Sequence, residues 1–395
     1  MNATARPVLA RNFHRLAWLA VLLTTCVVVF GAFVRLSDAG LSCPDWPTCY
    51  GRATWPSAPQ DAAAHAASEI RQFDTTKAWR EQVHRHLAAS LGVLVLVLAL
   101  MAARRRPYGI AQILGASLLV AGAIPAYMQG HTGLAFALAG AGEAILLLAA
   151  LRWSNVDLAR AAVLTLAVIV FQALLGKWTV TLLLKPIIVM GHLLGGLLTF
   201  SLLLWMAWRA TGLPIQLGDA PRHRRWLIVG LVLLGVQIAL GGWTSANYAA
   251  LACGGGGWTT AQPHYLDFPK CVGQWWPPGD FREGFVLWRG IGVDYEGGVL
   301  DGASRIAIQM AHRMMAVVVV AYLLLMSARM FRIPGMRGWS TLLAVGVLAQ
   351  ATLGVLNVKL ALPLPVAVLH NAGAVLLLFV LVTLLARLKR PGSLA

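Results

Sequence analysis

The chain has 395 residues, of which 58% are apolar and only 12% charged, and its formal net charge is +17. A charged fraction about half that of average soluble proteins excludes an ordinary soluble domain. The net charge alone would fit a nucleic-acid partner, but the basic residues occur in short segments between apolar runs, as in the cytoplasmic loops of membrane proteins. We therefore predict a membrane protein that binds no nucleic acid. The basic clusters are 104–106, 222–225, 329–337 and 387–390.

Apolar runs long enough to cross a bilayer follow one another along the chain. We predict ten spans, at 16–36, 83–103, 109–127, 132–152, 160–181, 187–208, 226–247, 306–328, 339–358 and 365–387. The first span follows two arginines, as in a signal peptide, but its pattern recurs later in the chain, so we expect it to be retained. With both termini in the cytoplasm, every basic cluster is cytoplasmic, and the polar loops 37–80 and 248–304 lie outside.

An internal repeat divides the chain into two related halves. The matching segments are Glu81–Arg85 with Gln309–Arg313, and Gln172–His192 with Gln350–His370. We predict an all-α, polytopic transmembrane helix bundle of two pseudo-symmetric four-helix halves, residues 1–212 and 222–395. The histidines are 108 residues apart in the first half (192 − 84) and 58 in the second (370 − 312). We interpret this difference as a two-helix hairpin inserted at about 105–155.

Four histidines occupy equivalent places in the two halves, towards the outer ends of their spans. Ionisable side chains within a span are costly and usually functional. One membrane histidine would fit an interhelical hydrogen bond equally well, but four at equivalent positions favour axial ligation of two planar metal macrocycles. The predicted pairs are His84 with His192, and His312 with His370. We interpret the other histidines as non-ligands: His14, His65, His86, His131, His223 and His264.

Charged groups beside these histidines differ between the halves. Arg85 and Arg313 follow a histidine directly, and Arg35 ends the first span; each is a candidate for binding a macrocycle's carboxylates or for reaching the lipid headgroups. Glu81 shares a helix face with His84, whereas Gln309 at the equivalent place cannot ionise. An interfacial glutamate that faces water would fit too. The asymmetry favours one catalytic and one electron-carrying site.

Four cysteines lie in the two outer loops. An oxidising outer compartment favours one disulfide in each loop, Cys43–Cys49 and Cys253–Cys271. A structural role is the default, and a redox role is the alternative. Neither pair has the C-x-x-C-H spacing of covalent heme attachment. Cys26 lies in the first span, where we expect it to be buried.

These elements together resemble the heme A synthase family, whose members convert heme O to heme A. The resemblance rests on Gly31–Pro47, Glu81–Arg85, Gln172–Val180, Pro186 with His192, Gln309–Arg313, and Gln350–Gly354 with His370. It covers nearly the whole chain outside the hairpin, whose presence suggests ten helices rather than the family's eight.

The resemblance implies an oxidoreductase that oxidises the C8 methyl of heme O to a formyl group by successive hydroxylations. It implies that His312 and His370 bind a heme b cofactor through its iron, that His84 and His192 bind the substrate heme, and that Glu81 is catalytic. It also implies a multi-pass protein of the bacterial inner membrane with periplasmic cysteine loops. The expected partners are membrane lipid, heme O, the farnesyltransferase that makes heme O, and an electron-transfer protein.

Two other functions compete with this interpretation. A diheme b-type electron-transfer protein, such as a quinol-linked cytochrome, would need the same four histidines, but it would not need a carboxylate at one heme only. A transporter would fit the repeat, but we find no broken mid-span helix with charged residues.

Overall fold

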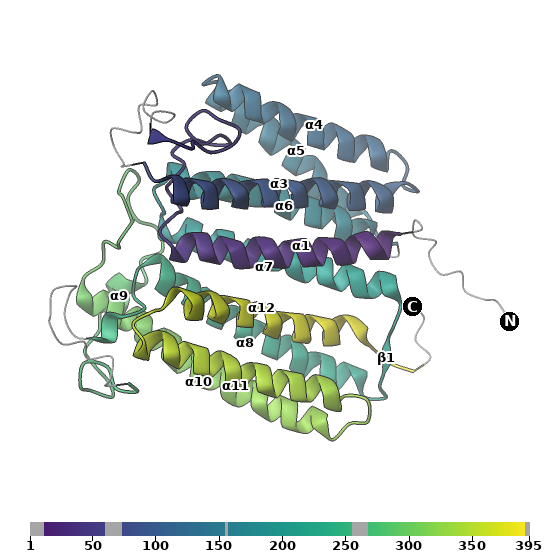
Figure 1. Cartoon of the computed structure of the whole chain (residues 1–395). Coiled ribbons are helices and arrows are strands. Elements are labelled where there is room, and N and C mark those ends of the chain that lie inside the picture. The colour runs from purple at the N-terminus through teal and green to yellow at the C-terminus, as the bar shows by residue number, and fades with distance from the viewer. Residues whose placement is uncertain (1–11, 60–72, 155–156, 255–267, 392–395) are drawn as a thin grey trace.

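The structure is a computed structural model that describes residues 12–59, 73–154, 157–254 and 268–391 (Figure 1). Within these residues, ten helices are long and apolar enough to cross a membrane. They are α1 (Phe13–Leu36), α3 (Thr75–Ala103), α4 (Gly109–Met128), α5 (Thr132–Arg152), α6 (Ala159–Thr181), α7 (Pro186–Thr211), α8 (Ala220–Ala246), α10 (Gly302–Phe331), α11 (Arg337–Lys359) and α12 (Leu364–Arg387). The ten predicted spans and the all-α class are confirmed.

Two helices begin well before the predicted spans: a side-chain cap explains the start of α3, and a proline in the first turn favours that of α8. The Asp74 side chain accepts hydrogen bonds from the N–H groups of Thr76 and Lys77, so α3 starts eight residues earlier than hydropathy indicates. At the start of α8, Pro221 occupies the first turn, where its missing N–H costs nothing. Capped first turns carry polar residues beyond the apolar run, so a hydropathy pattern cannot find them.

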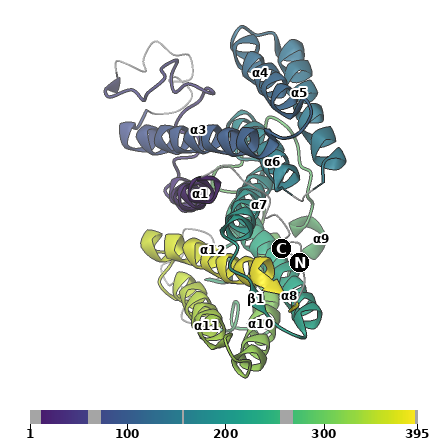
Figure 2. The same cartoon turned by 90° about the vertical axis from the view of Figure 1, so that its right-hand side faces the viewer.

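The eight helices other than α4 and α5 form two rings, each of four helices. In the first ring α1 contacts α3, α3 contacts α6, α6 contacts α7, and α7 contacts α1. The same cycle of contacts joins α8, α10, α11 and α12 in the second ring (Figure 2). The rings meet where α1 and α7 pack on α12 and where α7 packs on α8. Each predicted histidine pair therefore belongs to one ring.

The two ends of the bundle differ in character. One end, which we call the loop end, consists of residues 37–59, 247–254 and 268–301. These segments include the short helix α9 (Phe281–Gly284) and the 3₁₀ turn η2 (Ala252–Gly254). At the opposite, arginine end, strand β1 (Ile215–Gln216) pairs in parallel with β2 (Leu388–Lys389) (Figure 1). This pairing connects the α7–α8 linker to the end of α12.

The α4–α5 hairpin lies at the edge of the bundle and attaches to α6 and α3 (Figure 2). It carries one ionisable group in mid-span, although α5 is unbroken. Glu143 lies near the middle of α5, is half-buried, and has a buried Oε2 without a hydrogen-bond partner among the described residues. One expectation is corrected: Cys26 is exposed on α1 rather than buried.

Candidate functional site

The first histidine pair faces across the inside of the first ring. His84 of α3 and His192 of α7 have ring centroids 6.5 Å apart, with ring planes at 88°. Two imidazoles that bind one metal from opposite sides place their ring centres about 6 Å apart, because each metal–nitrogen bond is about 2 Å long. The spacing therefore fits axial ligation of one iron by His84 and His192.

Each of these imidazoles lies against a glycine of the neighbouring helix. A Cβ added at Gly31 of α1 would lie 2.7 Å from Nε2 of His84, and one at Gly176 of α6 would lie 3.3 Å from Cε1 of His192. All four helices of the ring thus contribute to the pair: α3 and α7 carry the histidines, and α1 and α6 carry the glycines that leave room for the imidazoles.

The second pair has matching contacts in the second ring. A Cβ at Gly241 of α8 would lie 3.1 Å from Cε1 of His312, and one at Gly354 of α11 would lie 3.2 Å from Cε1 of His370. On α6 and α11 the glycine follows a glutamine of the repeat by four residues, as Gly176 follows Gln172 and Gly354 follows Gln350. The contacts with the imidazoles explain why the repeat includes these glycines.

Side-chain amides contact both histidines of the second pair. The Gln237 amide nitrogen lies 3.2 Å from Nδ1 of His312, and that of Gln350 donates to the His370 carbonyl at 2.9 Å. At the place of Gln237, the first ring has Val27, which cannot hydrogen-bond through its side chain. The histidines of the second pair are therefore held by more polar contacts than those of the first.

Buried polar atoms without a partner occur at both pairs. Among the described residues, Nδ1 of His192, Nδ1 of His370, and Nε and Nη2 of Arg313 have no hydrogen-bond partner. No cluster of three or more His, Cys, Asp or Glu that could hold a bare metal ion occurs within these residues either. A macrocycle supplies four ligands itself and needs only two from the protein, so the donor set of two paired imidazoles fits a heme.

Glu81 lies beside the first pair. Its carboxylate is buried, accepts a hydrogen bond from Nε of Arg85 at 3.0 Å, and is near enough to His192 to interact electrostatically. The equivalent Gln309 is also buried, and its Oε1 has no hydrogen-bond partner among the described residues. The two rings therefore differ in charge at this position, as the sequence indicates.

Two of the three arginine candidates have other partners. All three nitrogens of Arg85 donate, to Glu81 and to the backbone carbonyls of Cys43, Asp45 and Thr48. The terminal nitrogens of Arg35 donate to the Ser245 carbonyl, in the last turn of α8, and to the Tyr248 hydroxyl, at the start of the second outer loop. Within the described part of the chain, Arg313 alone of the three keeps two unused donors, beside a single bond to the Lys270 carbonyl. Arg85 and Arg35 thus organise the loop end.

Both expected disulfides form, Cys43–Cys49 and Cys253–Cys271. The first loop is further organised by Asp45, which accepts hydrogen bonds from Thr48, Gly51 and Tyr50. Burial alone raises the pKa of the Asp45 carboxyl, but these donors outweigh it, and the pKa lies below its usual value. The disulfide loop is therefore held together by internal bonds, and its carbonyls accept hydrogen bonds from Arg85.

The other histidines do not join the pairs. His86 bonds the Gln82 carbonyl and His223 the Asp219 carbonyl, both within their own helices or helix starts. His14 lies in the first turn of α1 and His131 precedes α5. His65 and His264 lie outside the described residues.

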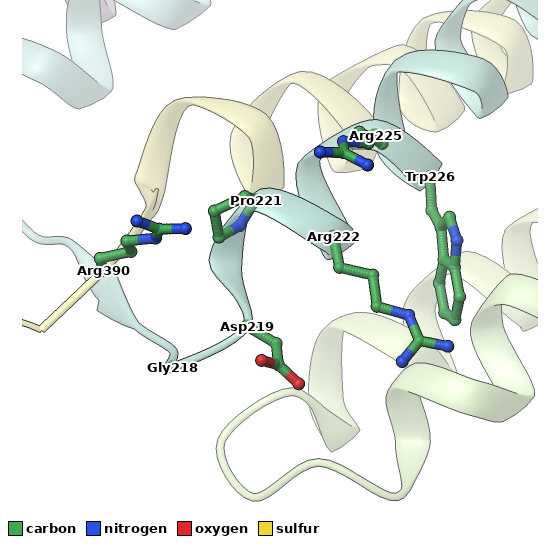
Figure 3. A pocket seen from close by; sticks show the side chains of 7 residues that line it. All are labelled: Gly218, Asp219, Pro221, Arg222, Arg225, Trp226 and Arg390. Carbon is green, nitrogen blue, oxygen red and sulfur yellow. The ribbon is translucent and has the colours of Figure 1, made fainter.

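Two surface cavities lie away from the histidines. One of about 490 Å³, at the arginine end, is lined by Gly218, Asp219, Pro221, Arg222, Arg225, Trp226 and Arg390 (Figure 3). A second, of about 350 Å³, lies between α4 and α5. Neither is lined by a histidine or by Glu81, so we place the candidate site inside the rings.

The glycine contacts give a first prediction. Gly31→Ala should weaken heme binding at the first pair about 10- to 100-fold, as displacing a metal ligand's support does elsewhere, because the new Cβ would push the His84 ring aside. Spectral titration with heme would measure this. Gly92→Ala, on α3 with nothing within 4 Å of the added Cβ, is the control. Equal affinities in the two variants would show that the close approach at Gly31 does not position the imidazole.

Comparison with known proteins extends these observations. A family model described as "Cytochrome oxidase assembly protein" (COX15-CtaA) matches residues 14–382. The chain is similar to the heme A synthase of Shewanella oneidensis, with 35% identity over 94% of this chain and 96% of that protein. It is also similar to those of Paracoccus denitrificans, 28% identical over 93% and 86%, and Rhizorhabdus wittichii, 27% identical over 91% and 89%.

The family match extends over all ten membrane helices, apart from the first residue of α1 and the last five of α12. The resemblance drawn from short motifs is therefore confirmed over nearly the full chain. The chain belongs to the COX15-CtaA family of cytochrome oxidase assembly proteins.

Proposed function

We propose that this protein is a membrane heme A synthase, which oxidises the C8 methyl of heme O to a formyl group by successive hydroxylations. The observation that carries the proposal is the facing pair His84 and His192, 6.5 Å apart inside the first ring, with a second histidine pair inside the other ring. The similarity to proteins named heme A synthase, which covers 94% of the chain in one case, supports the reaction.

The second ring is the proposed site of a resident heme b, held by His312 and His370. The glutamine contacts to both histidines and the two unused donors of Arg313 support this assignment. Bound there, a heme supplies one-electron transfer. The residues of the chain itself hold the two imidazoles, and Arg313 is suited to bind a carboxylate of the macrocycle.

The first ring is the proposed substrate site, in which His84 and His192 bind the iron of heme O. Glu81 is the proposed catalytic residue, because its carboxylate lies beside this pair and can accept or hold a proton. Arg85 fixes the orientation of that carboxylate through the bond at 3.0 Å. The division into halves at 1–212 and 222–395 follows the same assignment.

A diheme b-type electron-transfer protein is the less favoured alternative. It would use the histidine pairs equally well, but it gives no role to a buried carboxylate at one pair and a buried amide at the other.

The proposed orientation in the membrane follows from the two ends of the bundle. The arginine end carries the basic clusters, which the positive-inside rule assigns to the cytoplasm, and the loop end carries both disulfides, which an oxidising compartment favours. We therefore propose a bacterial inner-membrane protein with cytoplasmic termini and periplasmic cysteine loops. The farnesyltransferase that makes heme O and an electron-transfer protein are the proposed protein partners.

Heme extraction tests the function. Cells that make heme O but lack heme A should form heme A when they express this chain, and chromatography of the extracted hemes would detect it. Cells that express the His84→Ala variant, as the control, should keep heme O and form no heme A. A wild-type extract without heme A or a hydroxylated heme would contradict the proposal.

A further inference from the structure

One buried cation at the loop end takes no part in either histidine pair. Lys185 is the residue that precedes α7, and it is only 1% exposed. Its Nζ has no hydrogen-bond partner among the described residues, although an ammonium carries three donors. The ammonium lies 3.5 Å from the centre of the Trp288 ring. Burial lowers the pKa of this lysine, so leaving the charge without an anion is unfavourable.

The place of Lys185 relates it to the first histidine pair. It precedes His192 by seven residues, which is two turns of α7, so the two residues fall on the same side of the helix about 10 Å apart along its axis. The neighbouring Leu184 packs with Leu41 and Tyr295, which cover this part of the loop end. Lys185 therefore lies at the loop end of the first ring, above the His84–His192 pair.

Within the described residues, the second ring has an uncharged residue at the position equivalent to Lys185. Pro363 precedes α12 and lies seven residues before His370, just as Lys185 lies seven residues before His192. If the prolines at the two helix starts are matched instead, Leu364 is equivalent to Lys185. Both of these residues are uncharged, so the cation distinguishes the proposed substrate site from the proposed cofactor site.

Arg85 and Arg35, at the loop end of the first ring, are already engaged. All three nitrogens of Arg85 donate to Glu81 and the first loop, and the terminal nitrogens of Arg35 donate to the last turn of α8 and to Tyr248. Lys185, in contrast, has no hydrogen-bond partner for its ammonium among the described residues, and the Trp288 side chain over that ammonium is itself 63% exposed. A small movement of that indole would let an anion reach the ammonium.

We propose that Lys185 binds a propionate carboxylate of the substrate heme and so sets the orientation of the macrocycle in the first ring. This inference rests on the proposed function. The methyl at C8 and one propionate are substituents of the same pyrrole ring, so a cation that holds this propionate also fixes the position of the methyl. Lys185 is thus a binding residue that determines which edge of the heme is presented for oxidation.

The test compares hemin with its dimethyl ester, which lacks the carboxylate charges. Purified protein that carries its resident heme is titrated with each compound, and binding at the first pair is followed by the change in the heme absorption. The wild type should bind hemin about tenfold or more tightly than the ester, as a charge-assisted hydrogen bond implies. Lys185→Gln should lose this preference, and Lys185→Arg should keep most of it.

Two further variants separate carboxylate binding from a purely structural role of Lys185. Lys359→Gln removes an exposed lysine at the same end of the bundle, on α11, and should leave the preference unchanged. If Lys185 only holds the second loop through Trp288, then Trp288→Ala and Lys185→Gln should lower thermal stability alike while the preference for hemin stays at its wild-type value in both. That result would overturn the proposal.

The binding assay also separates this inference from the proposed function, because it requires no turnover. If the wild type prefers hemin through Lys185 but cells form no heme A, the function is wrong and the carboxylate site remains. If cells form heme A and Lys185→Gln keeps the full preference for hemin, the function remains and Lys185 is excluded.

Discussion

Replacing Glu81 with glutamine should leave heme bound and lower heme A formation by about 100-fold or more. The variant removes a proton-accepting group from the first pair while keeping its shape, and general acid–base groups contribute factors of about 10² to 10⁴. It also gives the first ring the side chain that the second ring has at Gln309. Heme O or a hydroxylated intermediate should accumulate in the cells, which chromatography of extracted hemes would show.

The ion pair with Arg85 requires a matched control, since Glu81 could act only by holding the first loop. Arg85→Gln removes the same pair at 3.0 Å and leaves the carboxylate. We expect this variant to lose thermal stability but to keep more activity than Glu81→Gln. If the two variants lose heme A formation equally, or if Glu81→Gln forms heme A normally, Glu81 has no direct role in the reaction.

The two histidine pairs should respond differently to substitution. His312→Ala or His370→Ala should remove the low-spin b-type spectrum of the purified protein, because an axial imidazole of the resident heme is lost. His84→Ala or His192→Ala should keep that spectrum yet abolish heme A formation. Absorption spectra of the reduced proteins and heme extracts of the same cells would measure both effects.

Two results would contradict this assignment of the histidine pairs. Full retention of the spectrum in His312→Ala would exclude the second ring as the cofactor site. Loss of the same spectrum in His84→Ala would indicate that the resident heme lies in the first ring, with the roles of the rings exchanged. His86→Ala, two residues away and bonded within its own helix, should behave as wild type.

The fold and the histidine pairs could be predicted because both depend on patterns that are local in sequence. Apolar runs of sufficient length predict the ten spans. The distance from Gln172 to His192 recurs in the second half because, in each half, two packed helices are joined by a turn of the same length. In the structure both turns contain two consecutive residues with positive φ, at 183–184 before α7 and at 361–362 before α12. The repeated Gln-to-His motif therefore predicts the same helix–turn–helix geometry in both rings.

The arginines could not be assigned in this way. An arginine beside a histidine can bind a ligand or a loop, and the choice depends on which backbone carbonyls the loop presents. The Cys43–Cys49 loop turns its carbonyls towards Arg85, whereas Arg313 donates to one carbonyl, that of Lys270, within the described ranges. Loop conformation is set by tertiary contacts, so the sequence pattern cannot predict which partner each arginine binds.

The burial of single charged residues could not be predicted from the sequence pattern either. Lys185 looks like a loop lysine in the sequence, but its ammonium packs on Trp288 of the distant second loop, and the neighbouring Leu184 packs on Tyr295 of the same loop. Glu143 interrupts an apolar run by one residue, which a hydropathy average hides, and it is half-buried on a helix that packs against α4 and α6. In both cases the burial depends on segments that the local pattern does not include.

Heme content per chain shows whether one histidine pair holds a resident heme and the other a substrate. Protein purified from cells that make only heme b should contain about one heme b per chain, and protein from cells that also make heme O should contain in addition heme O, a hydroxylated intermediate or heme A. His84→Ala should lose only this second heme. Two hemes b per chain in wild-type protein from both kinds of cell, with no heme O or heme A, would contradict these roles and favour a diheme electron carrier.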